Sequence, residues 1–210
     1  MKKIFPLVLL LLILLFSHSW AATYTVNASS DDAMQTGTTV TLTDTLIGND
    51  LDATTEWVGM RWTNVAIPKS AKIISAVISV VPTSNTQDEP LVTVFFEDAD
   101  NCATFSTGAS NISNRSRTTG VTWDNSNLGA NGSTYFDTPS LVSDLQTVVN
   151  RAGWASGNAI CAIIQGGATS TRDLTIEAYD LGPGTNPPRL VVTYASCNGG
   201  LLALGAGPGC

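Results

Sequence analysis

The sequence predicts an all-β protein, an antiparallel β-sandwich with one short capping α-helix. Short strand-like segments recur along most of the chain, and turn-forming residues separate them. Only one segment carries apolar residues at the spacing of an amphipathic helix. We therefore expect the strands to bury most of the core.

The first 21 residues have the composition of an export signal. Lys2 and Lys3 precede an apolar run over 4–16, and Ser19 and Ala21 form the small-x-small pattern that predicts cleavage after Ala21. The alternative is a retained membrane anchor, but a full span needs roughly 20 apolar residues. We expect a signal peptide over 1–21, a sandwich domain over 22–196 and a glycine-rich tail over 197–210. The protein is then secreted, or held at the cell surface.

From Tyr24 onward the chain is expected to form eight or nine strands. In the expected strand over 39–45, threonines at 39, 41, 43 and 45 alternate with Val40 and Leu42, so one face is apolar and the other hydroxylated. Further strands are expected at 57–67, 72–81, 91–97, 120–123, 159–165, 174–179 and 190–194.

The expected helix lies between Pro139 and Arg151. Thr138 suits an N-cap before a proline at the first helical position, and Gly153 is placed to end the helix in the left-handed conformation. The apolar side has helical spacing and consists of Leu141, Leu145, Val148 and Val149. A single amphipathic helix of this kind suits the open end of a sandwich.

Charge and histidine content exclude several functions. The formal charge is −7, and loss of Lys2 and Lys3 with the signal makes it −9, so a basic face for nucleic acid or anionic lipid is not expected. The one histidine, His18, lies in the predicted signal, which leaves no imidazole for a nucleophilic triad or a metal. A glycoside hydrolase would need two carboxylates, and the candidates on expected strands are Glu56, Glu97 and Glu177.

Four cysteines beyond the signal predict two disulfides. Cys197 and Cys210 enclose a glycine-rich segment that can close on itself, which leaves Cys102 to pair with Cys161. For Cys161, inside the apolar run 159–164, the alternative is a buried free thiol.

Two acidic clusters offer oxygen ligands to calcium, which does not require histidine. The first is Asp31 with Asp32, and the alternative is Glu97 with Asp98 and Asp100. Both clusters also suit solvated turns, since Asp favours turns for local reasons.

Aromatic rings and guanidinium groups are the candidate ligand-binding side chains. Trp123 follows a turn and is the best candidate for an exposed ring that stacks on a sugar, although tryptophans in strands are often core residues. Arg61 and Arg115 suit recognition of an anion or, alternatively, hydrogen bonding to backbone carbonyls.

A series of short motifs follows along the chain: Ser30-Asp31-Asp32-Ala33, Val58-Gly59-Met60-Arg61-Trp62, Ile112-Ser113-Asn114-Arg115, Val149-Asn150-Arg151-Ala152-Gly153-Trp154 and Tyr179-Asp180. Over 26–194 this series resembles bacterial secreted domains of the DNRLRE type, which are similar to carbohydrate-binding modules. The resemblance implies a jelly-roll sandwich, calcium in some members and an acidic polysaccharide as ligand in one group. By analogy with jelly-rolls, whose first and last strands often pair, Asp180 is expected to join Asp31 and Asp32.

These observations together predict a secreted, non-catalytic module that binds an extracellular polysaccharide or a cell-surface glycan, with Ca²⁺ in a structural role. One alternative is a structural surface protein that self-associates through sheet edges or the apolar segment 201–204. A less favoured alternative is a polysaccharide-degrading enzyme that uses two carboxylates.

Overall fold

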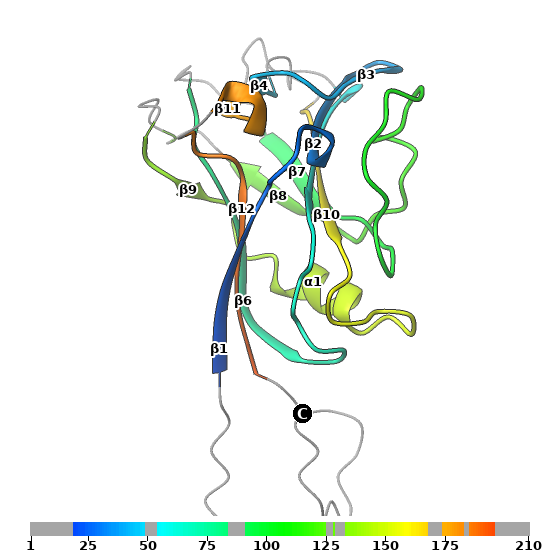
Figure 1. Cartoon of the computed structure of the whole chain (residues 1–210), viewed down its shortest axis with the longest axis vertical. Helices are drawn as coiled ribbons and strands as arrows, with labels where there is room; N and C mark the ends of the chain where they lie inside the picture. Colours follow the sequence, from blue (N-terminus) through cyan, green and yellow to red (C-terminus); the bar gives the residue numbers. More distant parts are fainter. Residues whose placement is uncertain are drawn as a thin grey trace, which may run out of the picture.

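The computed structural model describes residues 19–48, 54–83, 91–124, 128, 133–167, 174–182 and 185–195. They form a sandwich of antiparallel sheets with one α-helix (Figure 1). The predicted all-β sandwich with a single helix is confirmed. Within these residues no helix is both long enough and apolar enough to cross a membrane.

The smaller main sheet joins the two ends of the described chain. Its strand order is β1 (Ser19–Thr25), β12 (Arg189–Ala195), β6 (Lys72–Val80) and β9 (Phe136–Asp137). The first and last strands therefore pair, with Ser19 opposite Ala195 and Thr25 opposite Arg189. A register shift between Thr193 and Tyr194 interrupts the pairing of β12 with β6.

The larger sheet has six strands. Their order is β3 (Thr39–Thr41), β2 (Asp32–Thr36), β5 (Glu56–Trp62), β10 (Ile160–Gln165), β7 (Leu91–Phe96) and β8 (Val121–Asp124). A third, two-stranded sheet pairs β4 (Leu46–Ile47) with β11 (Ile176–Glu177). Two short 3-10 helices lie beside these strands, η1 (Ser29–Asp31) before β2 and η2 (Tyr179–Leu181) after β11.

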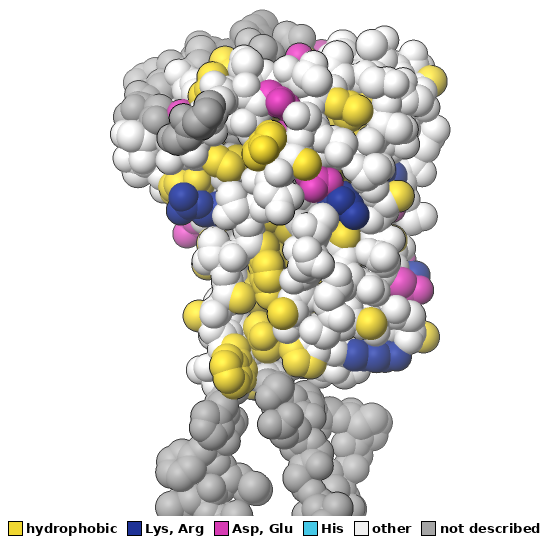
Figure 2. Space-filling model, in the orientation of Figure 1, with side chains coloured by type: hydrophobic (Ala, Val, Ile, Leu, Met, Phe, Trp, Pro, Cys, Tyr) yellow, Lys and Arg dark blue, Asp and Glu magenta, His cyan; other side chains and the backbone are white. Residues whose placement is uncertain are grey.

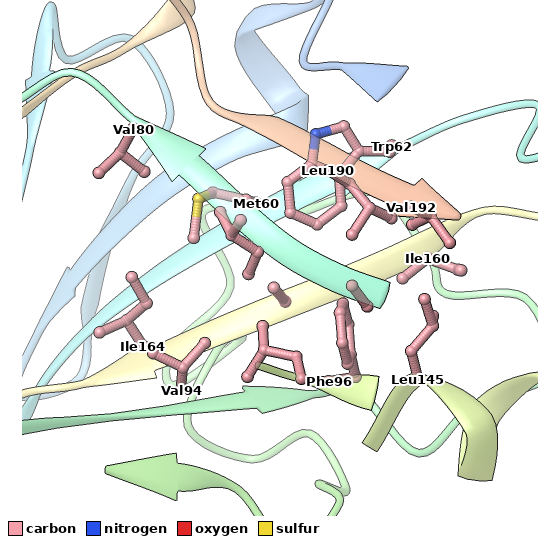
Figure 3. Packing of buried hydrophobic residues seen from close by; sticks show 14 of the residues in the cluster. Met60, Trp62, Val80, Val94, Phe96, Leu145, Ile160, Ile164, Leu190 and Val192 are labelled. Atoms are coloured by element: carbon pink, nitrogen blue, oxygen red, sulfur yellow. The ribbon is translucent and has the colours of Figure 1, made fainter. Parts of the chain in front are cut away.

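The main core fills the space between the two large sheets. In Figure 3, Met60 and Trp62 of β5 lie with Leu190 and Val192 of β12, and Phe96 of β7 lies near Leu145 of the helix. The indole N–H of Trp62 donates to the carbonyl of Pro188 at 3.2 Å, so its burial leaves no unpaired donor there.

A second, smaller core covers the outer face of the six-stranded sheet. Residues of the segment 98–119 pack there onto strand residues, and the buried set is Ala33, Val40, Trp57, Cys102, Phe105, Ile112, Ala159, Cys161 and Ile163. Because both faces of β5 and β10 are covered, most residues of these strands are buried and burial does not alternate along them.

Helix α1 (Val142–Val149) contacts β6 of one sheet and β7 of the other, so it closes the sandwich along one side. The predicted cap is wrong. The helix begins after Leu141, and the hydroxyl of Thr138 instead accepts a hydrogen bond from the Ile78 N–H at 3.0 Å. The predicted left-handed stop at Gly153 is also wrong, since Gly153 is not among the positive-φ residues. A Cβ at Gly153 would lie 2.2 Å from Asp100 Oδ2, so a larger residue here would have to displace the Asp100 side chain.

Most predicted strands are present, several of them with shorter bounds. The strand expected at 57–67 ends at Trp62, the one at 174–179 is reduced to β11, and the threonine ladder ends at Thr41. Strand β2, whose sequence is Asp-Ala-Met-Gln-Thr, was not predicted.

Candidate functional site

Asp31, Asp32 and Asp180 lie near enough to interact electrostatically where η1, β2 and η2 meet. Asp32 Oδ2 accepts a hydrogen bond from the Tyr179 N–H at 2.7 Å, and the Ser29 hydroxyl donates to Asp180 Oδ1 at 2.7 Å. These bonds bring Asp180 to the pair Asp31 and Asp32, from which it is far apart in the sequence. Asp31 and Asp32 are buried, so the cluster is not a solvated turn.

Arg61 of β5 compensates one of these charges. Its Nη1 lies 2.6 Å from Asp31 Oδ1, and its Nε donates to the carbonyl of Cys102 at 3.2 Å. The guanidinium is therefore used inside the protein. This arrangement matches the alternative in which Arg61 satisfies a backbone carbonyl.

Asp32 has no such compensation. Its side chain is 1% exposed, and among the described residues no basic group forms an ion pair with it. Burial raises the pKa of Asp32 to about 7, the Tyr179 N–H opposes this rise, and the neighbouring Asp180 and Asp31 add to it. A proton or a cation at this position would relieve the cost of the buried charge.

Asp180 provides the second sign of an unmet electrostatic need. Its Oδ2 is buried and has no hydrogen-bond partner. A buried carboxylate oxygen without a partner is uncommon in folded proteins. Carboxylate and hydroxyl oxygens are ligands that calcium accepts in irregular geometry, although the carboxylate oxygens of Asp31, Asp32 and Asp180 do not all lie within 4.8 Å of one another. Asp32 and Asp180 would hold such an ion, with Asp31 shared with Arg61.

Two large apolar side chains next to Asp180 in the sequence are exposed. Tyr179 and Leu181, on either side of Asp180 in η2, are 38% and 40% exposed. They are among the few large apolar side chains that the described part of the chain exposes. Sequence reasoning did not identify them as exposed, because it placed Tyr179 at the end of the expected strand 174–179 and Leu181 in no element.

The alternative acidic cluster is divided between two arginines. Glu97 Oε2 lies 2.7 Å from Arg115 Nη1, while Asp98 and Asp100 both pair with Arg151, the latter at 2.7 Å. Hydrogen bonds to Asp100 and Asp98 raise the pKa of Arg151. Glu97 also lies near Cys102 and Cys161, but those two sulfurs are bonded to each other and are not free to bind a metal.

Arg115 also has a structural environment. Its guanidinium donates to the carbonyls of Ala103 and Thr104 at 2.8 and 3.0 Å, and Nε donates to the carbonyl of Asn111 at 2.9 Å. The ring of Phe105 lies 4.2 Å from the guanidinium carbon. Arg115 therefore holds the segment 98–119 in place, as the alternative to anion recognition proposed.

The predicted Cys102–Cys161 disulfide is confirmed, with a Cα–Cα distance of 5.9 Å. It ties the segment 98–119 to β10. The predicted Cys197–Cys210 pair lies outside the described residues.

Trp123 is not an exposed stacking residue. It is 3% exposed and belongs to the main core, where β8 pairs with β7. Trp57, Trp62 and Trp154 are buried as well. The core interpretation of the tryptophans therefore holds, and the interpretation of Trp123 as an exposed ring is wrong.

The candidate catalytic glutamates lie on different elements. Glu97 pairs with Arg115, and buried Glu177 of β11 accepts hydrogen bonds from the backbone and side chain of Asn186 at 2.9 and 3.2 Å. Glu56 begins β5.

Comparisons with models of protein families and with curated proteins found no match.

Proposed function

We propose that this protein is an exported, non-catalytic sandwich module that binds an extracellular polysaccharide or a cell-surface glycan at η2. The observation that carries the proposal is the exposed ring of Tyr179 directly beside Asp180, whose buried Oδ2 has no partner. An exposed aromatic ring offers an apolar face to a sugar, and nearby polar groups orient it.

The rest of the molecule is consistent with this role. Charged residues make up 13% of the chain, so hydroxyl and amide groups supply much of its polarity. Figure 2 shows few charged side chains on the face it presents. The disulfide between Cys102 and Cys161 is typical of proteins outside the reducing cytoplasm.

A glycan array with the purified protein tests this function. We expect binding to at least one polysaccharide, and Tyr179→Ala should abolish it. Leu91→Ala is the matched control, because Leu91 is also a large exposed apolar residue but lies on β7 of the six-stranded sheet. Absence of binding to any glycan, together with concentration-dependent light scattering, would instead favour the self-associating surface protein.

We further propose that calcium binds between Asp32 and Asp180 and stabilises the fold. An ion that binds only the folded state raises the melting temperature by mass action. Excess calcium should therefore raise Tm and a chelator should lower it, and Asp180→Asn should remove the difference. Asp98→Asn should keep the difference, since Asp98 pairs with Arg151. Identical melting curves with calcium and with chelator would refute the calcium site.

A further inference from the structure

The peptide bond between Ala21 and Ala22, where the sequence predicts signal cleavage, lies inside a strand of the folded domain. Ala21 is opposite Thr193 and Ala22 is opposite Val192 in the β1–β12 ladder. Figure 1 shows β1 running beside β12, with β6 on the other side of β12. The bond is thus part of an ordered sheet.

A peptidase that reads small residues at alternate positions needs the chain in its own active site. Ser19 and Ala21 are such residues, and both side chains are exposed. Their backbone, however, is held along β12. To bring the Ala21 carbonyl to a catalytic group, residues on both sides of it must leave the ladder, which requires local unfolding of β1.

The order of the strands along the chain separates signal cleavage from the pairing of β1 with β12 in time. The partner of β1 is the last strand, and Val192 follows Ala22 by 170 positions. During export the N-terminal end emerges first, so β1 has no partner until nearly the whole domain has followed. Long-range pairing of this kind is also intrinsically slow.

We propose that the Ala21–Ala22 bond is a processing site that folding closes. A membrane-bound signal peptidase hydrolyses it while β12 is absent, and pairing with β12 then protects any bond that is still uncut. In the hydrolysis, water supplies a hydroxyl to the Ala21 carbonyl carbon and a proton to the Ala22 nitrogen. The leader leaves with a new carboxylate, and Ala22 becomes an N-terminal ammonium.

Cleavage at this bond leaves the domain closed. It removes Ser19, Trp20 and Ala21, and with them an indole that is 57% exposed. The retained part of β1 includes Tyr24, whose hydroxyl accepts a hydrogen bond from the Ala66 N–H at 3.1 Å. Cut and uncut chains are therefore expected to share one fold.

The test uses the full-length precursor in detergent and a purified signal peptidase, added either before or after refolding. Mass spectrometry measures the cut and its position. We expect the unfolded precursor, and a synthetic peptide of residues 15–27, to be cut between Ala21 and Ala22. The folded precursor should be cut at a rate at least about tenfold lower. Equal rates for folded precursor and peptide would show that folding does not close the site. A peptide left uncut at this bond would show that the site is wrong.

A pair of proline variants connects the protection to β1. Val26→Pro removes the hydrogen bond that the Val26 N–H, directly after β1, donates to the carbonyl of Pro188 at 3.1 Å, and it should raise the cleavage rate of the refolded precursor toward that of the peptide. Thr39→Pro alters the edge strand β3 of the other sheet and should leave the rate unchanged. Hydrogen exchange at the Ala22 amide of the wild-type precursor, which the register with Val192 directs toward β12, gives a second measurement that does not depend on either variant folding. Exchange as fast as in the peptide would contradict the protection. None of these results depends on glycan binding.

Discussion

Arg61 lies 2.6 Å from Asp31 and forms no ion pair with Asp32, although these two buried carboxylates are adjacent in the chain. The cluster therefore contains one compensated and one uncompensated acid. Because of this difference and the buried Oδ2 of Asp180, we expect protons and cations to act at the meeting point of η1, β2 and η2.

The first prediction concerns Asp32→Asn. Because the pKa of Asp32 rises from 3.8 to about 7 on folding, the folded state binds a proton more tightly than the unfolded state between these values. The free energy of unfolding should therefore fall as pH rises from about 4 to 7, with a ceiling of about 4 kcal/mol. The neutral variant should lack this loss and be more stable than wild type at pH 8 in chelator. Urea unfolding at several pH values measures the difference, and parallel pH profiles would contradict it.

The second prediction separates the core tryptophan from the exposed tyrosine. Trp123→Ala should cost about 3–5 kcal/mol of stability, because it removes a large buried side chain. Tyr179→Ala should cost no more than about 1 kcal/mol, as is usual for an exposed residue. Chemical denaturation measures both. A small loss for Trp123→Ala would show that its ring contributes little to the core.

The third prediction concerns the two disulfides. Replacing Cys102 and Cys161 by alanine should cost about 2–5 kcal/mol and loosen the segment 98–119. The corresponding change at Cys197 and Cys210 should cost far less, since the sequence predicts that this pair closes only a tail. Non-reducing peptide mapping checks the pairing, and a peptide joining Cys102 to Cys197 or Cys210 would refute it.

The fourth prediction compares two arginines. Arg115→Met should cost about 3–5 kcal/mol, because it leaves Glu97 and several carbonyls without their buried partner. Arg115→Lys should recover little of this loss, since an ammonium cannot reproduce the planar set of donors. Arg151→Lys is the control, with an expected cost below about 1 kcal/mol because its ion pairs are largely solvated. Equal costs at the two positions would contradict the structural role of Arg115.

The strands that sequence reasoning found are those with an apolar or alternating pattern. Strand β2 was not predicted because its two apolar residues, Ala33 and Met34, are adjacent and do not alternate with polar ones, and Gln35 is fully buried in it. The Gln35 side chain accepts hydrogen bonds from the N–H groups of Ile112 and Ser113 and donates to Gly37 and Ser113. A long-range network of this kind satisfies a buried amide but leaves no local signal in the sequence.

The candidate site was partly predictable for a similar reason. Acidic residues in turns indicate where a cation would bind, and the pairing of the first and last strands brought Asp180 into the expected region. Which aromatic side chains are exposed could not be predicted from the sequence. Trp123 and Tyr179 are both aromatic residues next to an aspartate, and only the packing of β8 against the core separates a buried ring from an exposed one.

The pairing of Ser19 with Ala195 places the entry and exit of the described chain side by side at one pole of the sandwich. Figure 1 shows η2, the orange turn beside the label β11, at the opposite pole. A membrane, an enzyme or a cell-wall anchor joined before Ser19 or after Ala195 would thus be attached at the end of the domain where β1 begins and β12 ends. The candidate site at η2 would then lie at the end of the domain that is farther from that body.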